Sequence, residues 1–233
     1  QLTEVAESLV EQVLDLATRY LQARHGAPCC GTGSKRRNAG FAIIAYGKFG
    51  GMELGYGSDL DLVFLHDSVG SSQQTDGPKR LDNAVFFARL GQRVIHLINT
   101  QTPAGVLYEM DMRLRPSGAS GLLVSSLEGF EEYQRDDAWT WEHQALVRAR
   151  AVAKRLSTHP AAFAMRWRSS CVQFRTTSNR VMSSSSSLRW MTSRRPSGMT
   201  SHSPWSTRSF LRSQATTGVE PESAGRVSTS TDM

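Results

Sequence analysis

Two aspartates, Asp59 and Asp61, stand one residue apart at the start of an apolar run that ends at Leu65. In a β-strand successive side chains point to opposite faces, so the two carboxylates share one face about 7 Å apart, while Leu60 and Leu62 point into the core. Carboxylate oxygens are the ligands that hard divalent cations prefer. The spacing therefore predicts a metal site that leaves coordination positions open for nucleotide phosphates.

A strand-length apolar run and a glycine-rich turn precede the aspartates. Residues 41–46 are apolar, and Gly47-Lys48-Phe49-Gly50-Gly51 follows them. Glycine lets the backbone amides of such a turn approach a phosphate closely. A glycine cluster by itself has low specificity, and the sequence here matches neither the P-loop motif nor the dinucleotide-binding fingerprint.

The order of strand, glycine turn and Asp-x-Asp resembles the nucleotidyltransferase superfamily of DNA polymerase beta. In the pattern of that superfamily, a hydrophobic residue, Gly, and Gly or Ser precede Asp-hydrophobic-Asp-hydrophobic by nine to thirteen residues. Here Tyr46-Gly47-Lys48 is followed by ten residues and then Asp59-Leu60-Asp61-Leu62. The resemblance implies an α/β (α+β) fold in which helices flank a small mixed sheet. Lys48 replaces the expected small residue, so its phosphate contact is expected to differ.

Superfamily members usually carry a third carboxylate on a neighbouring strand. Residues 106–115 alternate between apolar and charged side chains, which predicts a strand with Glu109, Asp111, Arg113 and Arg115 on one face. By the superfamily pattern Asp111 is the better third ligand and Glu109 the reserve. The two arginines are candidates for neutralising the charge of a triphosphate.

Three longer stretches in the same order resemble bacterial glutamine synthetase adenylyltransferases, namely residues 47–61, 108–118 and 139–150. The resemblance covers residues 1–153. It implies that AMP is transferred from ATP to a tyrosine hydroxyl of glutamine synthetase, with the PII signal protein and glutamine as regulators. Members carry one domain that attaches AMP and one that removes it, and residues 55–58 look more like the attaching, carboxyl-terminal copy.

The resemblance also assigns roles to individual residues. Two Mg²⁺ ions held by the catalytic aspartates would assist in-line attack on the α-phosphorus of ATP. The expected catalytic and metal-binding residues are Asp59, Asp61 and Asp111. The expected nucleotide-binding residues are Gly47, Lys48, Gly50, Gly51, Ser58, Arg113 and Arg115. The alternative function is that of a catalytically inactive, truncated fragment that acts only as a binding module.

The net positive charge of the chain comes from its last third. The net charge is +6 overall, but residues 1–153 hold 15 Lys and Arg against 18 Asp and Glu, whereas residues 154–233 hold 12 against 3. The catalytic part is therefore mildly acidic, and we expect no nucleic-acid partner.

Apolar periodicity predicts helices on both sides of the motifs. A helix is expected from Leu2, through apolar positions that include Val5 and Leu16, to an end near Gly26. Further helices are predicted at residues 81–100, 126–135 and 138–153. Arg148 and Arg150 on the last of these are interpreted as solvated or ion-paired, not catalytic. Residues 31–40 and 67–79 are predicted to be loops.

Residues 154–233 differ from the rest, because 29 of these 80 residues are Ser or Thr. We expect a nucleotidyltransferase domain at 1–153 and a tail at 154–233 that is disordered or translated in a shifted reading frame. The sequence holds no run of eighteen apolar residues and no signal-peptide pattern, so no membrane contact is expected. Three cysteines without a framework fit a reducing cytoplasm.

Overall fold

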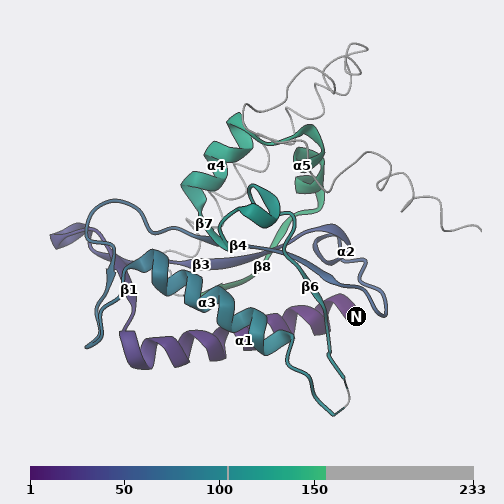
Figure 1. Cartoon of the computed structure of the whole chain (residues 1–233), viewed down its shortest axis with the longest axis horizontal. Coiled ribbons are helices and arrows are strands. Elements are labelled where there is room, and N and C mark those ends of the chain that lie inside the picture. The colour runs from purple at the N-terminus through teal and green to yellow at the C-terminus, as the bar shows by residue number, and fades with distance from the viewer. Residues whose placement is uncertain (104, 156–233) are drawn as a thin grey trace, which may run out of the picture. The chain divides into compact units, whose positions relative to one another are not determined.

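A mixed sheet lies at the centre of the computed structural model, which describes residues 1–103 and 105–155 (Figure 1). Strand β3 (Phe41–Ala45) pairs antiparallel with β4 (Leu60–His66) on one side and with β8 (Arg150–Arg155) on the other. The free edge of β4 carries two short parallel strands, β6 (Met110–Asp111) and then β7 (Val124–Ser126). The predicted fold class, α/β (α+β) with a small mixed sheet flanked by helices, is confirmed.

Helices cover both faces of this sheet. Helices α1 (Leu2–His25) and α3 (Asn83–Ile98) lie on one face, and α4 (Leu127–Asp136) lies on the other (Figure 1). Alternate residues of β3 enter the two cores, with Ile43 facing α1 and α3 and Ile44 facing α4. Because both faces are covered, β3 is apolar throughout and does not alternate.

A second, smaller sheet occupies segments that the sequence predicted to be loops. Strand β1 (Pro28–Cys30) pairs antiparallel with β2 (Arg37–Asn38) and β5 (Gln74–Thr75), and a 3₁₀ turn, η1, spans Gly33–Lys35. The loop predictions for residues 31–40 and 67–79 are therefore partly wrong. The polar composition of residues 67–79 concealed a strand whose backbone groups are satisfied by β1, more than forty residues earlier.

The bounds of α1 are confirmed, but the predicted buried face is only partly right, because Ala6 and Ala17 of the predicted stripe are buried and other members are not. Val5 and Leu16 are 60% and 58% exposed. The buried face is shifted around the helix and consists of Ala6, Val10, Leu14, Ala17 and Leu21. Both stripes have helical spacing, and the contacts with α3 and β8 determine which of them is buried.

The helix predicted over residues 138–153 is wrong in its second half. Helix α5 spans Thr140–Ala145, a 3₁₀ turn, η3, spans Leu146–Arg148, and the chain then extends as β8. Short runs of Ala and Val are compatible with either state, and pairing with β3 decides in favour of the strand.

The strand predicted over residues 106–115 is much shorter than expected. Only Met110 and Asp111 pair with β4. The strand ends there because the Asp111 carboxylate accepts a hydrogen bond from the Arg113 backbone N–H, and the Arg115 N–H then bonds the Met112 carbonyl. A second 3₁₀ turn, η2, follows at Gly118–Ser120.

The cysteines, the character of the helices and the end of the described chain complete the fold. Cys29 and Cys30 are buried free thiols. None of the helices within residues 1–103 and 105–155 is long and apolar enough to cross a bilayer. The predicted tail lies outside the described residues, apart from Lys154 and Arg155 at the end of β8, and Cys171 lies outside them as well.

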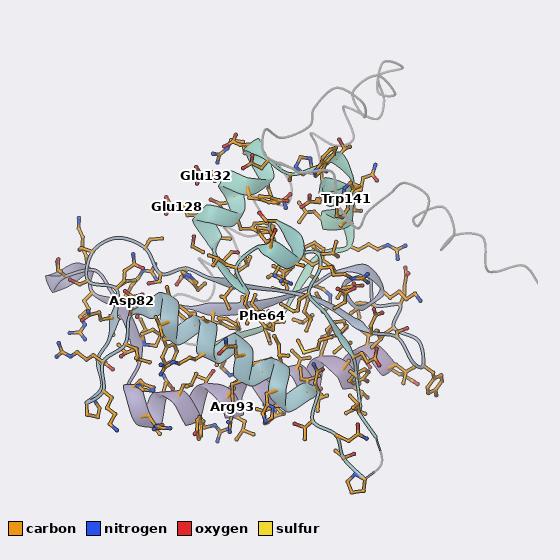
Figure 2. All side chains as sticks on the ribbon, in the orientation of Figure 1. Phe64, Asp82, Arg93, Glu128, Glu132 and Trp141 are labelled. Carbon is orange, nitrogen blue, oxygen red and sulfur yellow. The ribbon has the colours of Figure 1, made fainter. Side chains whose placement is uncertain are left out.

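Asp82 caps the helix that connects the two carboxylate-bearing strands (Figure 2). Its Oδ1 accepts a hydrogen bond from the Ala84 N–H at 2.9 Å. We expect Asp82→Ala to lower the free energy of unfolding by about 1 kcal/mol and Asp82→Asn to leave it almost unchanged, because Asn caps equally well. Urea denaturation measures both values. An equal loss in the two variants would assign the effect to charge and not to the cap.

Candidate metal and nucleotide site

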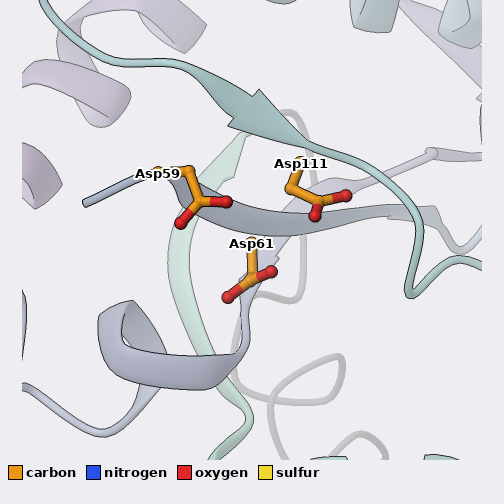
Figure 3. Close-up of side chains that lie close together, drawn as sticks. All are labelled: Asp59, Asp61 and Asp111. Carbon is orange, nitrogen blue, oxygen red and sulfur yellow. The ribbon is translucent and has the colours of Figure 1, made fainter. Parts of the chain in front are cut away.

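Three carboxylates meet at the edge of the sheet where β6 joins β4 (Figure 3). Asp61 is the second residue of β4, Asp111 ends β6, and Asp59 immediately precedes β4. The parallel register sets Asp61 directly opposite Asp111. One carboxylate oxygen from each residue lies within 4.8 Å of those from the other two. The structure thus brings together the three aspartates that the sequence predicted as ligands.

The glycine turn after β3 lies directly against one of these aspartates. It forms a single helical turn, α2 (Gly47–Gly50). Gly47 has a φ of +53°, and a Cβ atom at this position would overlap Oδ2 of Asp61. The Tyr46 N–H also donates to the Asp61 carbonyl at 2.9 Å. Only glycine allows the backbone to pass this close to Asp61 in this conformation.

The other end of the glycine turn, at Gly50, lies close to main-chain carbonyl groups. A Cβ atom at Gly50 would overlap the carbonyl oxygens of Arg148 and Ala45. The turn is therefore confined between Asp61 on one side and the backbone of β3 and η3 on the other. Its position and that of the Asp61 carboxylate are linked.

The electrostatics of the site reflect this crowding. Burial, helped by the charges of Asp59 and Asp111, raises the pKa of Asp61 to about 6. Burial also acts to raise the pKa of Asp111, but the hydrogen bonds and charge of Arg113 outweigh it, and the pKa of Asp111 is lowered. The Arg113 Nε donates to Asp111 Oδ2 at 2.6 Å. Three carboxylates are therefore crowded at the site, and Arg113 offsets part of their charge.

The other predicted nucleotide-binding residues are in different environments. Lys48 is exposed, and its charge acts to lower the pKa of Asp61. The Ser58 hydroxyl accepts a hydrogen bond from the Gly55 N–H at 3.3 Å. The guanidinium of Arg115 donates to main-chain carbonyls of the following turn, those of Met112, Ala119 and Gly121. Arg115 thus stabilises the loop that follows β6.

An open pocket of about 370 Å³ lies beside the carboxylates. Glu109, Arg113 and Arg115 line it together with Asp59 and Asp111. Glu109 thus faces the same pocket but is not one of the three clustered carboxylates. Its backbone carbonyl accepts a hydrogen bond from the Leu60 N–H at 2.8 Å, which extends the pairing between the two strands.

The chain matches a known protein family over more than half of its length. The family described as glutamate-ammonia ligase adenylyltransferase matches residues 1–164. The chain belongs to this family.

Several members of the glutamate-ammonia ligase adenylyltransferase family are similar to the chain over its first two thirds. Each is named bifunctional glutamine synthetase adenylyltransferase/adenylyl-removing enzyme. The protein from Thioalkalivibrio sulfidiphilus is 65% identical over 152 residues, which are 65% of this chain and 16% of that protein. The Pseudomonas putida protein is 64% identical over 151 residues (65% and 15%), and that from Nitrosococcus oceani is 55% identical over 165 residues (71% and 17%). The chain spans about one sixth of the length of these relatives.

Sequence reasoning missed the residues that support the loop between α2 and β4. The Leu54 N–H donates to the hydroxyl of Thr3 in α1 at 3.2 Å, and Glu53 forms an ion pair with Arg148 at 2.6 Å. The interpretation of Arg148 and Arg150 as ion-paired is confirmed. No local motif marks Thr3, because its partner is 51 residues away.

The raised pKa of Asp61 predicts a pH-dependent stability effect in this member of the glutamate-ammonia ligase adenylyltransferase family. A carboxyl group that binds its proton more tightly when folded contributes stability below pH 4 that is lost as the pH rises through about 6. In metal-free buffer Asp61→Asn should therefore stabilise the chain at pH 8, on the order of 1 kcal/mol after solvent screening, and have little effect at pH 4. Melting temperatures at the two pH values test this. An equal difference at both would contradict the assignment.

Proposed function

We propose that this chain is a nucleotidyltransferase that transfers AMP from ATP to a tyrosine hydroxyl of glutamine synthetase. The observation that carries the proposal is the cluster of Asp59, Asp61 and Asp111 against the glycine turn, in a chain of the glutamate-ammonia ligase adenylyltransferase family. The name that its relatives share supports glutamine synthetase as the protein substrate. The resemblance of residues 55–58 to the attaching copy supports attachment over removal.

The residues present fit Mg²⁺. Three carboxylates with oxygens within 4.8 Å of one another form a hard donor set, and their mutual repulsion favours a cation between them. Two bound Mg²⁺ ions would neutralise charge on the attacking and leaving oxygens and hold them in line. Asp59, Asp61 and Asp111 would hold these ions.

The remaining steps fall to side chains of the site. The tyrosine oxygen forms a bond to the α-phosphorus of ATP, the bond from that phosphorus to the bridging oxygen breaks, and pyrophosphate leaves. A tyrosine hydroxyl has a pKa near 10 and must lose its proton, either to Asp111 or with the help of a bound cation that would coordinate the oxygen. Arg113 and Arg115, which line the pocket, offset the charge of the triphosphate. The family resemblance favours Gly47, Lys48, Gly50, Gly51 and Ser58 as further contacts to the nucleotide.

The family resemblance supports a wider setting for this reaction. It favours glutamine and the PII signal protein as regulators of the whole enzyme, and the cytoplasm as its location. Incubation of the purified chain with glutamine synthetase, Mg²⁺ and ATP labelled at the α-phosphate tests the central proposal. Absence of protein-bound label with the unaltered chain would instead favour a binding role.

Substitution of the paired aspartates tests their role in catalysis. We expect Asp59→Asn and Asp61→Asn each to reduce labelled AMP transfer by at least roughly 10²- to 10³-fold, by analogy with the loss of one group that stabilises a transition state. Circular dichroism should show that both variants remain folded. Transfer retained in both would rule out the metal assignment.

A second pair of substitutions separates the two acidic residues of the β6 segment. Asp111→Asn should cause a loss as severe as that of Asp59→Asn, because Asp111 belongs to the carboxylate cluster. Glu109→Gln, which removes a charge from the same pocket, should cost less than tenfold in transfer rate, an upper limit corresponding to about 1.4 kcal/mol. Equal losses of transfer rate in Asp111→Asn and Glu109→Gln would contradict the choice of Asp111 over Glu109 as the third metal ligand.

A further inference from the structure

Arg150, the first residue of β8, contacts two other parts of the fold. Its guanidinium Nε donates to the Gly50 carbonyl and its Nη2 donates to the Phe49 carbonyl, both at 3.3 Å. The same guanidinium forms an ion pair with Glu7 of α1. Arg150 therefore connects the end of the α2 turn to the helix that covers the sheet.

The two carbonyls belong to the last residues of a helical turn, where main-chain acceptors have few intrahelical donors, and the Phe49 carbonyl also accepts a hydrogen bond from the Met52 N–H at 3.4 Å. A planar guanidinium presents several N–H groups in a fixed arrangement and can satisfy two neighbouring acceptors at once. A lysine ammonium carries the same charge but does not have this geometry. The contact is therefore specific for arginine.

Movement of this turn would affect the metal-binding face. Gly50 is pressed against the carbonyl oxygens of Ala45 and Arg148, and Gly47 is pressed against Asp61. If the turn moved away from β8, the distance between Gly47 and the Asp61 carboxylate would change as well. Arg150 holds the carboxyl-terminal end of the turn, through Phe49 and Gly50, whereas Gly47 at its start lies against Asp61.

We infer that Arg150 is a positioning residue for AMP transfer, which holds the glycine turn in the place where it supports Asp61 and meets the nucleotide. This inference rests on the proposed function. It adds a residue remote from the carboxylate cluster, acting through main-chain carbonyls and touching neither nucleotide nor metal.

Arg155 provides a matched control. It lies on the same strand and pairs with the same helix, through Glu11 at 3.2 Å and Asp15 at 3.3 Å. It also donates to the carbonyl of the neighbouring Lys154 at 2.9 Å. Substitution of either arginine weakens the tie between β8 and α1, but Arg150 in addition holds the turn.

The test compares Arg150→Lys, Arg155→Lys and the unaltered chain. We measure Mn²⁺ affinity by electron paramagnetic resonance, the affinity for the Mg²⁺ complex of a non-hydrolysable α,β-methylene ATP by calorimetry, and melting temperature. Residues that orient ligating groups typically contribute about 10- to 100-fold to affinity. We expect a loss in this range for Arg150→Lys and a change of less than about twofold for Arg155→Lys, with similar melting temperatures.

Gly50→Ala displaces the same turn from its other side and leaves Arg150 in place. It should weaken Mn²⁺ binding in the absence of nucleotide, which loss of a phosphate contact at Gly50 alone would not do, and this keeps the inference testable if Arg150→Lys does not fold. Failure of the unaltered chain to bind Mg²⁺-nucleotide would contradict the proposed function itself. Binding by the unaltered chain together with normal Mn²⁺ binding by Gly50→Ala, or equal losses in the two arginine variants, would overturn only the role of Arg150.

Discussion

The two-residue parallel pairing between β4 and β6 is the constraint on which the site depends. It places Asp61 opposite Asp111, although the two are 50 positions apart in the chain. Parallel strands cannot be joined by a tight turn, so the chain must cross the sheet between them, and α3 makes that crossing. The apolar face of α3 then packs on the same strands and fixes their register.

The cluster formed by this pairing is unfavourable for the folded chain without a cation. The pKa of Asp61 is raised to about 6 because burial and two neighbouring carboxylates disfavour its charge. Arg113 relieves part of the repulsion at Asp111. The surrounding structure holds the remaining charge together, because β4 is buried on both sides and the glycine turn leaves Asp61 little room to move. Stability lost at such a site is a common feature of binding sites for cations.

The turn itself is held by long-range contacts. Arg150 and Glu53 tie the loop that carries Gly50 and Ser58 to β8, η3 and α1. β8 and η3 lie about a hundred residues after the turn in the sequence and α1 about forty residues before it, yet all three hold the turn or the loop that follows it. The position of the glycine turn therefore depends on residues that lie outside the glycine motif.

The sequence by itself determined the local features, namely the Asp59 and Asp61 pair, the glycine turn, the strand before it, and the helices at residues 2–25 and 83–98. Each has a short-range signal in spacing or composition. Only the tertiary structure decided that residues 150–155 form a strand, that β6 stops at Asp111, and that Leu14, not Leu16, faces the core. These outcomes depend on pairing and packing between distant segments. Such contacts override local propensity and leave no periodic trace in the chain.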